Sequence, residues 1–454
     1  MTKTEWLESM KAFLESQRPN AEGGLTAVSL FSGAGISDLG YELAGFRFVV
    51  QVELQKVRAQ LGKDNFPHSK WIVGDVREAT TDIVRQYRES TDRPLELLVA
   101  TPPCQGMSSS NPSRGKRQSG RSAAQEAKNR LILEVVPVAK ALKPKVIVAE
   151  NVRPVLTLRV SGGVMEKRVI DLLEEGLRDY EVFEGVVNTA DYGIPQARRR
   201  AVVVAIRKDQ AWLQQLTEAK ASPWPRRTHS DKGAGGLLSW INVQEWFKFM
   251  AYEPLDARSV ETSQGTHPLH RVPHYEGDEY LRVRDIPPYS SKSAYQNETC
   301  PTCGHSPVAE GLVICPACGM VMKNRPWVMD GGQPRLIKGF RSSYRRMYPE
   351  RPAPTITTNS SHIGSDYKIH PWENRVLSTL ECSDLQTVPR FFDWSHAFST
   401  DRPYLIRNVV GEALPTYFAY LHGKAIRAGL SGEATGHLLE PADGKRVEAS
   451  AAAT

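Results

Sequence analysis

The sequence predicts an α/β fold built around a doubly wound, mostly parallel sheet to which both ends of the chain contribute. Short apolar runs alternate with stretches in which apolar residues recur at helical spacing, which is typical of βα units. Several of these runs stop at a glycine loop, at two prolines or at a carboxylate. In open α/β sheets the carboxyl ends of the strands form the edge where ligands bind, so we expect the functional residues to gather there.

Length and composition indicate a globular protein with a large core. The chain has 454 residues, of which 40% are hydrophobic, and this predicts two to three domains. Its formal charge of +7 is compatible with a polyanionic partner. The sequence contains no apolar run long enough to span a membrane and no basic-then-apolar N-terminus typical of a signal peptide. We therefore expect a soluble, cytoplasmic protein.

The first βα units predict a nucleotide-type site. The apolar segment Leu25–Phe31 leads through the loop Ser32–Ile36 into a predicted helix, and glycines in such a loop let the backbone approach a ligand. The next predicted strand, Phe48–Glu53, ends in a carboxylate of the kind that binds ribose hydroxyls. The glycine spacing is not G-x-G-x-x-G, which favours a cofactor without a pyrophosphate. A third strand, Trp71–Val73, leads to Asp75, which is either a ligand-binding carboxylate or an ordinary helix N-cap.

A cysteine follows the fourth predicted strand. The apolar run Leu97–Val99 stops at Pro102 and Pro103, which cannot continue a sheet ladder, so the thiol of Cys104 is presented at the carboxyl end of the strand. Backbone amides there would favour the thiolate, which is the nucleophilic form. A buried structural cysteine is the alternative. Residues 108–121 are rich in Ser, Gly, Arg and Lys and form either a loop that closes over phosphates or a solvated surface loop.

Two further segments bring charged side chains to the same edge. The apolar run Lys145–Ala149 ends at Glu150, and burial would raise the pKa of this carboxyl enough for it to act as a general acid near neutrality. Farther along the chain, three consecutive arginines precede another predicted strand. Alternation along the strand places Arg198 and Arg200 on one face and Arg199 on the other.

These motifs, in this order, resemble those of the C5-cytosine DNA methyltransferases. Ordered motifs with matching strand contexts, which here cover roughly two thirds of the chain, are far more specific than any single motif. The segments that carry the resemblance are Phe31–Gly35, Glu53, Gly74–Val76, Pro102–Gln105, Glu150–Val152, Gln196–Arg200, Arg351–Thr357 and His370–Gln386.

The resemblance implies transfer of a methyl group from S-adenosylmethionine to C5 of a cytosine in duplex DNA. It assigns to Cys104 the addition to C6, and to Glu150 the contact with N3, helped by Arg198 and Arg200. Because C6 is unreachable within stacked bases, the cytosine must be flipped out. The residues implied to bind S-adenosylmethionine are Phe31, Ser32, Gly33, Gly35, Glu53, Asp75, Val76, Pro103 and Asn408.

The C-terminal region departs from the family pattern at one position. The family has a glycine before the asparagine that helps to close the cofactor pocket, whereas this chain has Arg407 before Asn408. We expect Cys382 to be a core cysteine and residues 412–428 to be helical. Residues 431–454 are rich in Gly, Ala and Ser, which predicts a disordered tail.

Four cysteines between the catalytic motifs predict a metal site. Cys300 with Cys303, and Cys315 with Cys318, form two C-P-x-C-G knuckles separated by eleven residues. Four thiolates make a closed tetrahedral zinc site, which is structural because it has no open position for catalysis. Disulfides and free thiols are the alternatives, and a reducing compartment favours zinc. The zinc either contacts DNA or holds together a domain with a small core, and we favour the second function.

The resemblance also implies a target recognition domain in the segment that interrupts the catalytic motifs. Residues 323–351 combine basic and aromatic side chains and are our candidate surface for phosphates and base edges, although a charge run is usually a solvated face. The basic residues of this segment are Lys323, Arg325, Arg335, Lys338, Arg341, Arg345, Arg346 and Arg351.

The predicted organisation is an inserted domain within a catalytic domain. The segments are an N-terminal helix over 1–24, the catalytic domain over 25–235, the recognition domain with its zinc ribbon over 236–350, the catalytic return over 351–430, and the tail. We expect a bacterial, nucleoid-associated monomer that acts on double-stranded DNA, either beside a cognate restriction endonuclease or as a solitary methyltransferase. Three alternatives remain: a tRNA-directed enzyme of the same fold, a catalytically silent DNA-binding relative, and an unrelated methyltransferase or hydrolase with a similar sheet.

Overall fold

We analysed a computed structural model of the chain. It describes residues 1–103, 127–161, 165–339, 342–399, 404–433 and 437–442. The predicted nucleophile, Cys104, and the basic loop that follows it lie outside the described residues, as does Arg341.

A seven-stranded sheet forms the centre of the fold, in the order β3-β2-β1-β4-β5-β10-β8. Neighbouring strands pair in parallel, except that β10 runs antiparallel to both β5 and β8. The predicted α/β fold with a mostly parallel sheet is therefore confirmed. The strands are β1 Leu25–Leu30, β2 Phe46–Glu53, β3 Lys70–Val73, β4 Leu97–Ala100, β5 Val146–Asn151, β8 Tyr180–Asn188 and β10 Arg199–Arg207.

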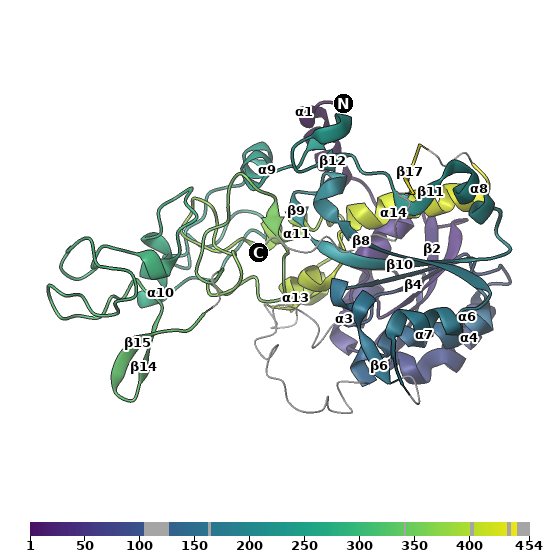
Figure 1. Ribbon diagram of the computed structural model, residues 1–454, viewed down its shortest axis with the longest axis horizontal. Helices are drawn as coiled ribbons and strands as arrows, with labels where there is room; N and C mark the ends of the chain where they lie inside the picture. The colour runs from purple at the N-terminus through teal and green to yellow at the C-terminus, as the bar shows by residue number, and fades with distance from the viewer. Residues whose placement is uncertain (104–126, 162–164, 340–341, 400–403, 434–436, 443–454) are drawn as a thin grey trace.

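Helices cover both faces of this sheet, and alternate strand residues point into two cores (Figure 1). On one face, α2 (Ile36–Leu43) packs against α14 (Thr416–Ser431), so the two ends of the chain meet there. The N-terminal helix α1 (Lys3–Leu14) buries Trp6 in the same core. The other face is covered by α4 Val76–Ser90, α6 Val135–Leu142 and α7 Val169–Gly176.

The remaining elements are short. They are α3 Lys56–Asn65, η1 Leu131–Glu134, η2 Arg153–Thr157, β6 Arg159–Ser161, β7 Glu166–Arg168, η3 Thr189–Tyr192, β9 Gln196–Ala197, α8 Ala211–Ala219, β11 Ala221–Pro225, β12 His229–Ser230, η4 Ala234–Gly236, β13 Leu238–Ser239, α9 Val243–Met250, η5 Ala294–Gln296, β16 Ala353–Pro354, α11 Thr379–Leu385 and α12 Ser395–Ser399.

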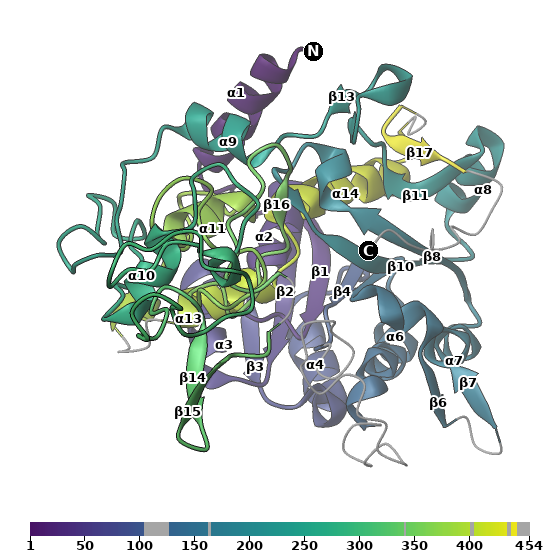
Figure 2. The same cartoon turned by 60° about the vertical axis from the view of Figure 1, so that its left-hand side comes forward.

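A second part of the chain lies beside the sheet and has little regular structure (Figure 2). It contains helix α10 (Asp278–Arg284) and a hairpin of β14 (Trp327–Asp330) and β15 (Gln333–Leu336). A small core of its own joins residues of 255–294 to residues of 344–376. This core extends past residue 350, where the sequence predicted the recognition domain to end.

Two sequence-based expectations about the C-terminal region are corrected. The helix predicted over 412–428 is broken: α13 (Leu405–Glu412) ends before Pro415, and α14 begins after it, because proline disfavours a helical conformation for the residue before it. The predicted tail is partly ordered, since β17 (Leu439–Pro441) pairs antiparallel with β11. Buried Leu439 anchors it in the main core. Cys382 is fully buried, as expected.

Within the described residues, none of the helices is both long and apolar enough to cross a membrane.

Candidate active site

The strand register brings the predicted site residues to one edge of the sheet. Leu30 pairs with Val52 on one side and with Ala100 on the other, and Ala100 pairs with Ala149. The residues that follow these strand ends therefore lie next to one another. These residues are Phe31, Glu53, Thr101–Pro103 and Glu150.

The segment that leads to Cys104 is anchored on both sides. The backbone N–H of Thr101 donates to the carbonyl of Leu30 at 3.2 Å, and its hydroxyl donates to the carbonyl of Phe31 at 2.9 Å. On the other side, the Asn151 amide donates to the carbonyl of Pro102 at 3.1 Å. The chain just before Cys104 is thus fixed between the predicted cofactor loop and the strand end that carries Glu150.

Glu150 and Arg200 form a buried ion pair at this edge. Arg200 Nε lies 2.9 Å from Glu150 Oε1, and Glu150 is 7% exposed. Burial raises the pKa of the Glu150 carboxyl, while the charges of Arg200 and Arg198 oppose this rise. Burial therefore favours the protonated form of Glu150 relative to a carboxyl in water. A protonated carboxyl can share its proton with a bound base.

Arg198 occupies a more structural position than the sequence predicted. It is fully buried, and its guanidinium donates to the main-chain carbonyls of Ile356, Gly411 and Glu412 at 2.9–3.0 Å. The last two carbonyls belong to the C-terminal end of α13, where carbonyls lack helical partners. Arg198 therefore braces this helix, and its charge also lowers the pKa of Glu150. Exposed Arg199 lies between the two other arginines, as alternation predicted.

The glycine loop after β1 adopts a left-handed backbone. Phe31, Gly33 and Gly35 have φ values of 58°, 58° and 79°, of which only the first is unusual for its residue type. Gly35 caps α2, and a Cβ there would lie 2.4 Å from the Phe66 ring. Glycine is therefore required at this position by both backbone and packing.

Glu53 is bound to this loop. Its carboxylate accepts hydrogen bonds from the backbone N–H of Gly33 at 2.9 Å and of Gln55 at 2.8 Å. Burial raises the pKa of Glu53, and these hydrogen bonds oppose the rise. A carboxylate has about four acceptor positions, so two remain for a ligand. Buried Ser32 donates to the carbonyl of Ser29 at 3.1 Å.

Asp75 is the N-cap of α4, which was the alternative interpretation of this residue. It accepts from the backbone N–H of Arg77 at 3.0 Å and pairs with the Arg77 guanidinium. Hydrogen bonding to Arg77 lowers the pKa of Asp75. Its neighbour Val76 is 3% exposed and belongs to the core beneath α4.

The structure explains the arginine that replaces the family's glycine. Arg407 is buried on α13 and donates to the carbonyl of Leu377 at 2.8 Å and to the Ser360 hydroxyl at 3.2 Å. Its guanidinium also lies 3.6 Å from the Cys382 sulfur. Arg407 thus ties α13 to the residues around α11, while the adjacent Asn408 is half-buried.

One buried acid below the glycine loop was missed by the sequence analysis. Asp38 accepts hydrogen bonds from the Ser29 hydroxyl at 3.0 Å and from the Gln51 amide at 2.8 Å. Burial raises the pKa of Asp38 to about 7. The sequence of α2 gave no clear signal for this acid, because Ser37 and Glu42 are also polar residues of the same short helix.

The four knuckle cysteines come together in the second part of the chain. Their sulfur atoms all lie within 4.8 Å of one another, with the Cys300–Cys318 and Cys303–Cys315 pairs at 3.8 Å. Four sulfurs bound about 2.3 Å from one zinc ion would be about 3.8 Å apart. Each knuckle closes with a glycine N–H donated to the first cysteine's carbonyl at 2.9 Å. The cysteine cluster therefore fits a tetrahedral metal site.

The basic segment 323–351 divides into buried and exposed cations. Arg325 donates to the carbonyls of Asn297, Val308, Ala309 and Leu312 at 2.6–2.7 Å. Arg346 donates to the carbonyls of Val283, Ile286 and His370 at 2.9–3.1 Å. These two arginines hold loops together and are fully buried, which corrects their assignment to a DNA surface. The exposed cations of the segment are Lys323, Arg335, Lys338 and Arg351.

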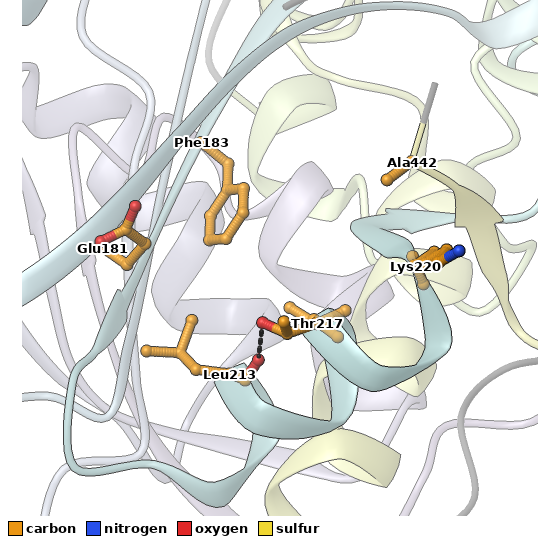
Figure 3. A pocket seen from close by; sticks show the side chains of 8 residues that line it. Glu181, Phe183, Leu213, Thr217, Lys220 and Ala442 are labelled. Atoms are coloured by element: carbon orange, nitrogen blue, oxygen red, sulfur yellow. Dashed lines mark hydrogen bonds between the residues drawn. The ribbon is translucent and has the colours of Figure 1, made fainter. Parts of the chain in front are cut away.

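A hollow between β8 and α8 is unrelated to this site (Figure 3). Phe183 and Leu213 line it. Phe183 of β8 pairs with Val204 of β10, which pairs with Val148 of β5. Glu181, two residues before Phe183, lies level with Val146, the first residue of β5. The hollow therefore lies toward the opposite end of the sheet from Glu150.

Comparisons with known proteins agree with these motifs. A family model described as C-5 cytosine-specific DNA methylase matches residues 25–428. The type II methyltransferase M1.HgaI of Avibacterium volantium is 26% identical over 408 residues, covering 86% of this chain and 95% of that protein. The type II methyltransferase M.PspPI of a Psychrobacter strain is 25% identical over 429 residues, covering 94% of this chain and 83% of that protein.

A solved structure supports the fold. The crystal structure of a protein described as a DNA modification methyltransferase encoded within a prophage (E. coli) has a TM-score of 0.50 and 19% identity, covering 90% of this chain and all of that chain. Since the family model spans most of the sequence, the chain belongs to the C-5 cytosine-specific DNA methylases and is a DNA (cytosine-5)-methyltransferase.

Proposed function

We propose that this enzyme methylates a flipped-out cytosine within one short duplex DNA sequence, with Cys104 as the nucleophile and Glu150 as the acid. The observation that carries this proposal is the buried Glu150–Arg200 ion pair, 2.9 Å long, at the sheet edge where the chain leads to Cys104. The Asn151–Pro102 hydrogen bond joins the two strand ends. A cytosine placed there would have C6 on the Cys104 side and N3 on the Glu150 side.

Each group has a distinct role in the reaction. The Cys104 thiolate adds to C6, and Glu150 holds a proton at N3, so that the electrons displaced from the C5–C6 double bond make C5 nucleophilic. Arg200 orients Glu150 and balances charge at the edge of the ring. After methylation, removal of the C5 proton re-forms the double bond and expels the Cys104 thiolate. Arg198 supports this geometry by holding α13 in place.

The edge also has the residues for S-adenosylmethionine, which supplies the methyl group when bound. We infer that Phe31, Ser32, Gly33 and Gly35 surround the methionine end, because their loop brings backbone close to the strand ends. Glu53 keeps two acceptor positions for ribose hydroxyls, and we assign Asp75 to the adenine in addition to its role as the N-cap of α4. The residues inferred to complete the pocket are Val76, Pro103 and Asn408.

We further propose that the cysteine cluster of the second part binds a structural zinc ion. The ligands would be Cys300, Cys303, Cys315 and Cys318, and their sulfur spacing supports this assignment. The metal would hold together an inserted target recognition domain whose apolar core is small and extends past residue 350. Exposed cations of this domain would contact DNA phosphates.

The partners follow from the family and the relatives. Double-stranded DNA is the substrate, and the type II methyltransferases among the relatives favour a role in restriction and modification. In such a system a cognate endonuclease recognises the same sequence.

Bisulfite sequencing tests this function directly. DNA from a bacterial host without cytosine methylation would be compared after expression of the wild type, Cys104→Ser and Glu150→Gln. We expect protected cytosines in one short sequence context with the wild type and none with Cys104→Ser. Absence of protection with folded, zinc-loaded wild type would contradict the proposal and favour the tRNA-directed or silent alternatives.

A further inference from the structure

The β14–β15 hairpin has one face that is turned entirely to solvent. Its register pairs Val328 with Arg335 and Asp330 with Gln333. Residues directly opposite each other share a face of an antiparallel pair, as do residues two apart. These four side chains therefore form one face, which we call the open face, and all four residues are exposed.

The opposite face attaches the hairpin to the protein. It carries Trp327, Met329, Pro334 and Leu336, three of which are partly buried. The Trp327 indole N–H donates to Asp278 of α10 at 3.2 Å. The orientation of the hairpin is thus set by one face, and the open face is free for a partner.

The open face carries three polar side chains beside Val328, and an ion pair joins two of them. Asp330 and Arg335 form an ion pair across it, yet their side chains are still 60% and 47% exposed. The turn between the strands is Gly331-Gly332, with φ values of 58° and 80°, which favours a tight hairpin. Figures 1 and 2 show this hairpin projecting from the rest of the second part.

Positive charge flanks the hairpin at its base. Lys323 precedes β14 and Lys338 follows β15, and both are exposed. Neither lysine forms an ion pair with any residue that the structure describes. Because Arg325 and Arg346 are buried, much of the accessible positive charge of this basic segment lies around the hairpin.

We propose that the β14–β15 hairpin enters the major groove of the target DNA and reads part of the recognition sequence. Gln333 and Arg335 contact base edges, while Lys323 and Lys338 contact the flanking phosphates. This inference rests on the proposed function, because it assigns the reading of the DNA that the enzyme methylates. A ribbon of four residue pairs is about 14 Å long, and the major groove, about 12 Å wide, admits a two-stranded ribbon.

The side chains of the open face suit this role chemically. Arginine donates two hydrogen bonds to the O6 and N7 acceptors of guanine, and glutamine pairs with the N6 and N7 atoms of adenine. In the free protein the Arg335 guanidinium pairs with Asp330 and also donates to the carbonyl of Leu336 at 3.2 Å. Release from this exposed ion pair costs little, so Arg335 can exchange it for a base.

Methylation of a DNA library with randomised bases around the target cytosine tests the hairpin. We expect Arg335→Ala and Arg335→Lys to lose preference at one base pair by about ten-fold or more, because lysine keeps the charge but not the two-pronged geometry. Gln333→Ala should relax a different base pair. Lys323→Ala with Lys338→Ala should weaken DNA binding and reduce its salt dependence while the sequence context stays the same. Arg85→Ala, which removes an exposed arginine of α4, is the control for loss of a surface charge.

A second readout does not require activity. A photo-crosslinking amino acid at position 328 should crosslink to duplex DNA, and the same group at position 85 should not. The inference is overturned if all Arg335 and Gln333 variants keep the wild-type context and rate, or if position 328 gives no crosslink. A wild type that methylates no DNA would instead refute the proposed function, and the crosslink would still decide whether the hairpin contacts DNA.

Discussion

The sheet edge and the cysteine-bearing second part hold their polar side chains in different ways. At the edge, the register of buried strands places Leu30, Ala100 and Ala149 side by side, so the residues after them converge, and hydrogen bonds between the strand ends add to this placement. The second part has few regular elements, and Arg325 and Arg346 connect its loops through main-chain carbonyls. We therefore expect the sheet edge to keep its structure when the second part is damaged. DNA recognition, which we assign to the second part, should be lost.

Loss of the proposed zinc ion is expected to have the largest effect, because it should separate the stability of the second part from that of the sheet. Chelation of zinc, or Cys303→Ser, should unfold the second part, because structural zinc sites contribute about 10–16 kcal/mol of apparent binding energy in zinc-finger peptides. The sheet should remain folded and should still bind S-adenosylmethionine, since none of the four knuckle cysteines belongs to its cores. Metal analysis, hydrogen exchange and calorimetric titration with S-adenosylmethionine measure these effects.

Thr302→Ala is the matched control for the metal, because Thr302 lies between two knuckle cysteines and is exposed. It should keep one zinc per chain. A purified wild type without zinc, or equal loss of structure in the sheet, would contradict the proposed division.

Removal of one buried arginine should also destabilise the second part, but by less than the loss of zinc. Arg346→Leu leaves the carbonyls of Val283, Ile286 and His370 without their donor. Each unsatisfied buried acceptor costs about 1–3 kcal/mol, so we expect a loss above about 3 kcal/mol in urea unfolding. Arg351→Leu is the control: exposed Arg351 stacks 4.9 Å from the Tyr348 ring, a contact worth about 0.5–1 kcal/mol. Equal losses in both variants would argue against the bracing role.

The sequence predicted the sheet edge well because strand ends carry strong local signals. Apolar runs that stop at Pro102, at Glu53 and at Glu150 indicated both the strands and their functional edge, and the register follows from the parallel βα pattern. Burial of individual charged side chains could not be predicted in this way. Arg325 and Arg335 look alike in sequence, yet one donates to four carbonyls inside the fold and the other lies on an exposed hairpin.

Tertiary contacts also explain the features that the sequence analysis did not predict. The three-residue strand β17 forms because Leu439 finds a place in the main core, although the surrounding composition suggested disorder. Asp38 was not recognised because its partners, Ser29 and Gln51, come from two different strands. The reason for an arginine at position 407 is visible only in the fold, where its guanidinium donates to the carbonyl of Leu377.

At the sheet edge, loss of Arg200 should change the pH dependence of the reaction. The charge of Arg200 lowers the pKa of Glu150, so Arg200→Ala should raise it. If protonated Glu150 is the active form, activity falls as pH rises through this pKa, and the fall in kcat/KM should move to higher pH in the variant. Arg199→Ala, one residue away and exposed, should keep the wild-type profile. A shift to lower pH would contradict the role of Glu150 as an acid.

The smallest expected effect separates the two interpretations of Asp75. Asp75→Ala removes the N-cap of α4 and should cost about 1 kcal/mol of stability. Asp75→Ser keeps a capping hydroxyl but is too short to reach a ligand, so it should retain most of this stability. If Asp75 also binds adenine, both variants should show several-fold weaker binding of S-adenosylmethionine by calorimetry. Wild-type affinity in Asp75→Ser would mean that Asp75 serves the helix alone, and that the cofactor site depends on Glu53 and the glycine loop.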